Sequence, residues 1–216
     1  MKNVIASDLE GTLTTAETWR ALGEFVKANG RAAEYKRFFY SRVPSVLMAR
    51  ADLINAQRFR ESWFASMTRF LRGFGRDKID ELMTMIANTS WAARRTDVIA
   101  ELEQHIASGG RVIIASGTYQ QAAEGFAARI GAQAIGTGLE VDANGIATGN
   151  LIGTVSTGET KLARVRERLQ GGALIAAYGD TEGDIPLLTA AEQAVAVHPD
   201  KRLRAAALAQ GWRLLE

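Results

Sequence analysis

Apolar residues follow two different spacings in the two halves of the chain. After a short apolar strand at residues 3–7, apolar side chains recur at helical spacing from about residue 15 to residue 108, as in Trp19, Leu22 and Val26. From residue 111 onward, short apolar runs alternate with helical stretches. Strands that alternate with helices predict βαβ units, and therefore an α/β fold with a Rossmann-like parallel sheet and helices on both faces.

The helical residues that follow the first strand interrupt this alternation. We interpret residues 16–90 as an all-helical cap inserted after the first strand, and residues 1–15 and 91–216 as the α/β core. Pro44 is expected to break or kink the cap helix predicted over residues 32–48, because proline lacks a backbone N–H. Core strands are predicted at 111–115, 132–137, 173–178 and 194–197, and core helices at 120–130, 159–169, 184–191 and 200–210.

Composition excludes several classes of function. The chain has 26 Lys and Arg against 24 Asp and Glu, a net charge of +2, and no basic tract, so we expect neither nucleic acid nor a membrane as partner. It has no cysteine, which excludes a disulfide framework, a thiolate metal site and a cysteine nucleophile. No segment approaches the roughly 20 apolar residues of a membrane span, and Asp8 comes too early for a signal peptide. We therefore expect a cytoplasmic protein.

Polar and acidic residues gather where the predicted core strands end. Open parallel sheets bind ligands at the carboxyl ends of their strands. Asp8 and Glu10 follow the first strand, Ser116-Gly117-Thr118 follows the second, and Asp180 and Asp184 follow a later one. We therefore expect these side chains to share one edge of the sheet.

The carboxylates at these ends suggest a metal. Asp8 and Glu10 can supply a nucleophile or a metal ligand, although the same residues also form ordinary turns after strands. Acids at two neighbouring strand ends repel each other unless a cation lies between them, and Mg²⁺ prefers oxygen ligands. Asp184 could instead cap a helix, but capping leaves Asp180 unexplained. Mg²⁺ is the cofactor that we predict.

Two further features suit an anion. Small residues such as Ser116, Gly117 and Thr118 leave backbone N–H groups facing a helix N-terminus, where anions bind, although they also form ordinary caps. Lys161 lies near the start of a predicted helix and can clamp a phosphate, or it can be a surface lysine. These features favour a phosphate-bearing ligand.

In chain order, the motifs are Asp-x-Glu-Gly-Thr, Ser-Gly-Thr, Lys and Gly-Asp-x-x-Gly-Asp. This order resembles the haloacid dehalogenase (HAD) superfamily, and within it the phosphoserine phosphatase-like branch with a helical cap. The resemblance covers the whole chain and implies that Asp8 attacks phosphorus to form an aspartyl-phosphate. Glu10 would serve as acid and base. The other implied roles are Mg²⁺ ligands (Asp8, Asp180 and the Glu10 carbonyl), phosphate binding (Ser116, Gly117, Lys161) and support (Thr118, Asp184).

Two positions depart from the family pattern. Glu10 stands where most of these phosphatases have Asp, which leaves open whether water or an alcohol is the better acceptor. Gly183 stands where phosphoserine phosphatases typically carry Asn.

The cap holds the candidates for substrate contact. Glu17 matches a glutamate that binds the substrate's amino group, or is a first-turn helix acid. Arg60 is our candidate for a substrate carboxylate, with Arg50 and Arg58 also in range. Six aromatic side chains are interpreted mainly as packing core of the cap, with one or two left over for a pocket: Tyr35, Phe38, Phe39, Tyr40, Trp63 and Phe64.

The sequence therefore predicts a Mg²⁺-dependent phosphatase that hydrolyses a small, phosphoserine-like phosphomonoester through an aspartyl-phosphate. One alternative is a phosphotransferase to an alcohol acceptor. Another is a non-catalytic, phosphate-dependent binding or regulatory protein. The physiological substrate, the open or closed state of the cap and the oligomeric state are left open by the sequence.

Overall fold

Seven strands form one sheet in the computed structural model, which describes residues 3–50 and 53–216. Their order is β4-β3-β2-β1-β5-β6-β7, and every neighbouring pair is parallel except β3 with β4. The strands are β1 (Asn3–Ser7), β2 (Arg111–Tyr119), β3 (Gln133–Val141), β4 (Ala147–Ile152), β5 (Ala173–Gly179), β6 (Gln193–Val197) and β7 (Arg213–Leu215).

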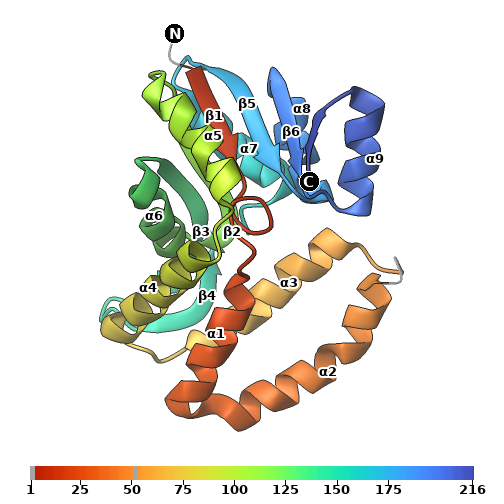
Figure 1. The fold of residues 1–216 in the computed structure, drawn as a ribbon. Coiled ribbons are helices and arrows are strands. Elements are labelled where there is room, and N and C mark those ends of the chain that lie inside the picture. The colour runs from red at the N-terminus through yellow and green to blue at the C-terminus, as the bar shows by residue number, and fades with distance from the viewer. Residues whose placement is uncertain (1–2, 51–52) are drawn as a thin grey trace.

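Helices cover both faces of this sheet (Figure 1). On one face, α5 (Thr96–Ala107) and α6 (Gln120–Ala127) pack over Ile5 and Ile114; on the other, α7 (Gly158–Leu169), α8 (Ile185–Thr189) and α9 (Lys201–Gln210) pack over Ala6 and Ile113. Strands that are buried on both faces require continuous apolar runs, as β1 has. The predicted α/β fold is confirmed.

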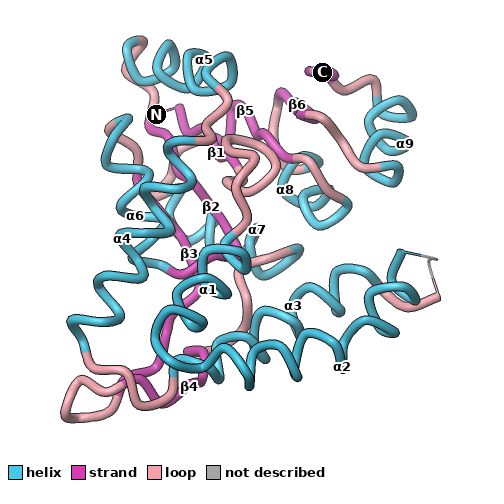
Figure 2. Tube along the Cα trace, turned by 60° about the horizontal axis from the view of Figure 1, so that its bottom comes forward, coloured by secondary structure: helices cyan, strands magenta, loops and turns pink. Residues whose placement is uncertain are grey.

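Between β1 and α5 the chain forms a helical insertion, defined here as α1 to α4. Its helices are α1 (Thr18–Val26), α2 (Ala32–Arg50), α3 (Ala56–Thr68) and α4 (Arg76–Ala92). Figures 1 and 2 show α2 and α3 side by side, with α2 on the outside. The helix α4 packs on α6, where Gly125 leaves room for the methyl group of Ala87. The domain boundaries at 15/16 and 90/91 stay a prediction.

Aromatic side chains form the core of the insertion, as predicted. Trp63 packs edge-on against Trp19 and Phe39, with ring centroids 6.2 and 5.9 Å apart. Phe64 lies 4.8 Å from the ring of Tyr119, which joins the insertion to β2. Tyr40 differs, because 70% of it is exposed.

Several elements differ from the prediction. The helix α2 continues through Pro44, so the break is absent, and the alternative of a kink stays a prediction. The strand β2 continues past residue 115 because Tyr119 pairs with Thr137 after a shift in register, so Ser116, Gly117 and Thr118 lie within the strand. The short edge strand β7 was not predicted.

The described helices include none with the length and apolar character of a bilayer span.

Candidate active site

Asp8 and Asp180 meet at the carboxyl ends of β1 and β5. The two strands are parallel neighbours, and the Asp8 backbone N–H donates to the Tyr178 carbonyl at 2.9 Å. The turn after β1 closes against Asp180: a Cβ added to Gly11 would lie 1.9 Å from Asp180 Oδ2, and the Thr12 hydroxyl donates to Asp180 Oδ1 at 3.1 Å. Gly11 also has a φ of +87°, which favours glycine. Both sequence motifs therefore converge on one point.

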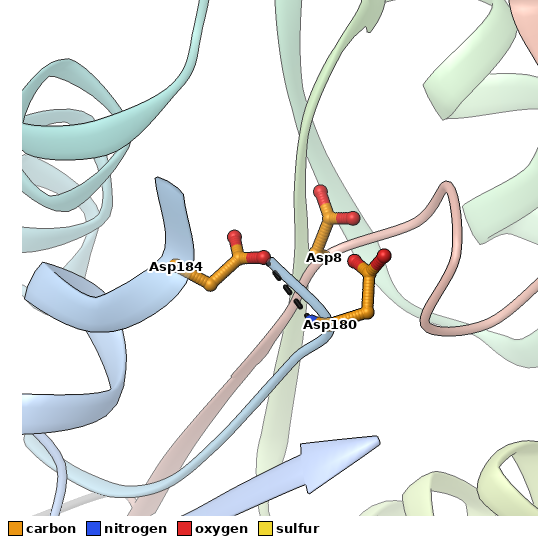
Figure 3. Close-up of side chains that lie close together, drawn as sticks. All are labelled: Asp8, Asp180 and Asp184. Carbon is orange, nitrogen blue, oxygen red and sulfur yellow. Dashed lines mark hydrogen bonds between the residues drawn. The ribbon is translucent and has the colours of Figure 1, made fainter. Parts of the chain in front are cut away.

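Asp184 belongs both to a capping box with Thr181 and to this cluster. Its Oδ2 accepts from the backbone N–H groups of Asp180 and Thr181, each at 3.2 Å, in a reciprocal capping box with Thr181. Its Oδ1 lies 2.5 Å from Lys161 Nζ. Asp184 makes no side-chain cap to the helix α8 (Ile185–Thr189) that follows it, so the predicted N-cap is not seen, and Figure 3 shows its side chain beside Asp8 and Asp180.

Lys161 is buried between two carboxylates. Only 3% of the residue is exposed, and its Nζ lies 2.7 Å from Asp8 Oδ1 as well as near Asp184. Burial lowers the pKa of Lys161, but attraction to Asp184 and Asp8 outweighs burial and raises the pKa above its ordinary value. The ammonium is therefore a fixed charge at the cluster, and the alternative of a surface lysine is excluded.

The three aspartates make a group that suits a hard divalent cation. One carboxylate oxygen from each of Asp8, Asp180 and Asp184 lies within 4.8 Å of the others. Burial raises the pKa of Asp8 to about 6, and burial with repulsion from Asp8 and Asp184 raises the pKa of Asp180 well above its usual range. Three carboxylates facing the single ammonium of Lys161 carry excess negative charge. Their oxygen donors and charge fit Mg²⁺.

The Glu10 carboxylate lies outside this group and faces the start of α1. Its Oε1 accepts from the Thr18 backbone N–H at 3.0 Å and from the Thr18 hydroxyl. That hydroxyl lies 2.6 Å from the hydroxyl of Thr118, so a chain of oxygens links the first motif to the second. Burial, which outweighs the hydrogen bonds from Thr18, raises the pKa of Glu10 to about 7. A carboxyl group of this kind can donate a proton near neutral pH.

Ser116 is buried and Gly117 half-buried beside the loop that precedes α7. Ser116 Oγ accepts from the Thr118 N–H at 3.2 Å, and the Gly117 carbonyl accepts from the Thr137 hydroxyl at 2.9 Å. A Cβ added to Gly117 would lie 3.2 Å from Thr157 Cγ2. The structure thus brings the second motif next to the helix that carries Lys161, and the proposed phosphate contacts stay a prediction.

Glu17 lies at the edge of the site. Its side chain is 43% exposed and pairs with Arg20, one turn along α1. Its charge nevertheless helps to raise the pKa of Glu10, although less than burial does. The predicted contact of Glu17 with a substrate amine stays a prediction.

Arg60 lies on α3, with its side chain 48% exposed and its Nη2 4.0 Å from Glu182 Oε1. Arg58 is exposed on the same helix. The side chain of Arg50 lies outside the described residues.

Three threonines near the site are not predicted from the sequence. Thr12 and Thr18 hold the carboxylates of Asp180 and Glu10, and Thr157 contacts α3 from the loop before α7. Thr12 lies inside the first motif, which was the one signal available for it. No motif marks the others: Thr18 bonds to Glu10 across a turn, and the partner of Thr157, Glu61, is 96 positions away.

Comparison with known sequences identifies relatives. Residues 5–189 match the family model described as haloacid dehalogenase-like hydrolase. The phosphoserine phosphatase SerB1 of Mycobacterium tuberculosis is 34% identical over 150 residues, which cover 67% of this chain and 46% of that protein. The histidinol-phosphatase of Neisseria meningitidis is 40% identical over 88 residues, covering 38% of this chain and 40% of that protein. The chain therefore spans about half the length of these curated relatives or less.

Solved structures share the fold. A Bordetella pertussis protein of unknown function has a TM-score of 0.81 at 24% identity, covering 100% of this chain and 99% of the other. A substrate-bound phosphoserine phosphatase has a TM-score of 0.66 at 16% identity, covering 100% and 93%. At these identities the likeness establishes the arrangement of elements alone.

Proposed function

The chain belongs to the haloacid dehalogenase-like hydrolase family, and we propose that it is a Mg²⁺-dependent phosphatase that hydrolyses a small phosphomonoester through an aspartyl-phosphate. One observation carries the proposal above all. Asp8 is buried at the end of β1, and Lys161 lies 2.7 Å from its carboxylate within the cluster of three aspartates. This arrangement offers an ionised nucleophile beside a fixed positive charge, as phosphoryl transfer requires.

The proposed chemistry has two steps. In the first, a carboxylate oxygen of Asp8 attacks phosphorus, the bond to the leaving oxygen breaks, and Glu10 donates a proton to that oxygen. In the second, water attacks the phosphorus of the aspartyl-phosphate, Glu10 accepts its proton, and Asp8 is released with inorganic phosphate. The pKa of Glu10, about 7, supports both roles, because the group can donate and accept near neutral pH.

The phosphoryl oxygens would lie among Lys161, the Ser116 hydroxyl and the Gly117 N–H. Mg²⁺ would be held by Asp8 and Asp180, with the Glu10 carbonyl predicted as a further ligand and Asp184 nearby. When bound, this ion neutralises charge on the transferring phosphoryl group. The side chains of this chain would do the rest: Lys161 and Ser116 orient the phosphate, and Glu10 moves the proton.

We further propose that residues 16–90 act as a cap over this site and that the substrate is the phosphate of a small amino alcohol. The names of two relatives support the substrate class. In both phosphoserine and histidinol phosphate, the carbon next to the one that bears the phosphate ester carries an amine. Glu17 stays the candidate for that amine, and Arg60 the candidate for a carboxylate.

The test is phosphate release from a panel of esters with Mg²⁺ and with EDTA. The panel contains phosphoserine, histidinol phosphate and phosphoethanolamine, with glycerol 2-phosphate as the ester without an amine. Asp8→Asn removes the nucleophile, and Asp77→Asn, at an exposed acid of α4, is the matched control. We expect release that needs Mg²⁺, is retained in Asp77→Asn and is abolished in Asp8→Asn.

Other outcomes point to other functions. Turnover by Asp8→Asn at the wild-type rate would exclude the aspartyl-phosphate. A phosphorylated product that forms only when an alcohol is added would identify a phosphotransferase. Binding of Mg²⁺ and phosphate without turnover of any ester would favour a non-catalytic binding protein.

A further inference from the structure

Thr157 occupies the position that caps the helix carrying Lys161, but its hydroxyl does not cap it. The helix α7 begins at Gly158, and Thr157 has the extended backbone of an N-cap residue, with φ −135° and ψ 164°. Threonine is favoured there because its hydroxyl accepts from an N–H of the first turn. In this structure that hydrogen bond is not made, and the hydroxyl instead donates to Glu61 Oε1 on α3.

Gln57, one turn before Glu61, completes the contact. Its Nε2 donates to Glu61 Oε1 at 2.9 Å and lies 3.5 Å from Thr157 Oγ1. Gly158 leaves room for it, because a Cβ there would lie 2.6 Å from Gln57 Nε2. Gly183 is also a neighbour, since a Cβ there would lie 3.9 Å from Gln57 Oε1, at ordinary contact distance. The first turns of α3 therefore lie against two core loops, one leading to Lys161 and one to Asp184.

The arrangement of the insertion agrees with these contacts. Figure 1 shows α3 between α2 and the core, so α3 is the helix that faces the carboxyl ends of the strands there. Arg60 adds a longer contact from the same helix, 4.0 Å from Glu182 in the loop after β5. Three polar side chains from the first two turns of α3, Gln57, Arg60 and Glu61, reach these core loops or lie near them. Farther along the same helix, Phe64 packs on Tyr119 of β2.

We propose that Thr157 is a positioning residue whose hydroxyl changes partner when α3 docks on the core. With α3 docked, the Thr157 side chain is oriented so that its hydroxyl donates to Glu61 and accepts no N–H of α7; with α3 away, the side chain can turn so that its oxygen accepts one. The position of α7 would then depend on whether α3 is docked. Because α7 carries Lys161, the position of Lys161 relative to Asp8 would depend on docking as well. The catalytic consequence rests on the proposed function, whereas the docking contact itself does not.

A distance measurement tests docking without turnover. Because the chain contains no cysteine, spin labels can be placed by Arg58→Cys on α3 and Glu159→Cys on α7, both exposed. We expect the doubly labelled protein to show mainly one short separation. Thr157→Val keeps the shape but removes the hydroxyl, so it loses the bond to the charged Glu61 when α3 is docked and the weaker cap when α3 is undocked. The difference should lower the ratio of docked to undocked protein by roughly three- to tenfold.

Three further variants sharpen the test. Thr157→Ser keeps a hydroxyl and should restore the wild-type distances. Thr154→Val changes an exposed threonine in the same loop and should leave them unchanged. Glu61→Gln keeps an acceptor but loses the charge, so it should fall between wild type and Thr157→Val.

Kinetics give the second readout. For the best ester, kcat/KM should fall in Thr157→Val in proportion to the loss of docked protein that the distances report, and recover in Thr157→Ser. Unchanged distances in Thr157→Val would overturn the proposal, even if activity or melting temperature fell, because Thr157 would then only stabilise the fold. If no ester is turned over, the distances still decide whether α3 docks through Thr157, and the failure belongs to the proposed phosphatase.

Discussion

Replacing Gly11 by alanine tests whether the turn after β1 places Asp180 for metal binding. Gly11 has a φ of +87°, and an added Cβ would lie 1.9 Å from Asp180 Oδ2. Gly30 offers a matched control, since it has a φ of +84° and nothing within 4 Å of an added Cβ. Both substitutions introduce the same backbone strain, but only one of them collides with a carboxylate.

The expected effects differ in kind. Left-handed backbone costs an L-residue about 1–2 kcal/mol, so both variants should lose about that much free energy of unfolding. In Gly11→Ala the Asp180 carboxylate must also retreat by about 1.5 Å to reach an ordinary contact of 3.4 Å, and it then loses the hydroxyl of Thr12. A misplacement of about 1 Å at a reacting centre can cost about 10²-fold in rate, and disturbed ligand support about 10- to 100-fold in metal affinity.

Three assays separate the two contributions. Urea unfolding measures the strain, calorimetric titration measures Mg²⁺ affinity, and phosphate release from the best ester measures kcat/KM. We expect Gly30→Ala to lose stability alone, and Gly11→Ala to lose stability, Mg²⁺ affinity and about 10²-fold in kcat/KM. If Gly11→Ala matched Gly30→Ala in metal affinity and rate, the close packing of this turn on Asp180 would have no functional consequence, and our account of the metal group would be wrong.

Two further substitutions probe charge. Lys161→Ala leaves the Asp8 and Asp184 carboxylates without their buried cation, so we expect the free energy of unfolding without Mg²⁺ to fall by about 3–5 kcal/mol. Phosphate release should fall about 10²-fold or more; wild-type values in both assays would contradict the role of the lysine. Glu101→Gln removes a carboxylate that Arg213 holds in two hydrogen bonds of 2.8 and 2.6 Å, which lower the pKa of Glu101 below 4.5. Because that pKa is lower in the folded state, its stabilisation is present above about pH 4.5 and disappears as the pH falls through the lowered value. Urea unfolding should therefore show wild type more stable than Glu101→Gln by less than about 1 kcal/mol at pH 7, since the pair is partly exposed, and equal to it in acid; a difference that persists in acid would show that packing, and not charge, is responsible.

Much of the site was predictable because parallel sheets impose a rule. Apolar runs mark the strands, and the carboxyl ends of neighbouring parallel strands lie at one edge of the sheet. The sequence therefore predicts that Asp8 and Asp180 lie close together, without knowledge of any contact. The structure agrees, since Asp8, Asp180 and Asp184 lie together at that edge. The insertion and its aromatic core were predictable for a similar reason, because helical spacing is a local property.

The extent of β2 was less predictable. Its apolar run ends at Ala115, but the strand continues to Tyr119 because β3 offers a partner at Thr137. Strand length depends on what lies alongside, and a single segment of sequence does not contain that information.

The sequence by itself determined the fold class and the order of the motifs, because both follow from local periodicity and from the chirality and packing of βαβ units. Tertiary structure alone decided the states of the side chains. Lys161 is a buried cation only because Asp8 and Asp184 lie on either side of it, and Glu10 has a raised pKa because the folded chain buries its carboxyl group. The Thr157 hydroxyl bonds to Glu61, 96 positions away, where local rules would have it cap its own helix. Charge and hydrogen bonding depend on neighbours in space, and these neighbours come from parts of the chain that no local pattern connects.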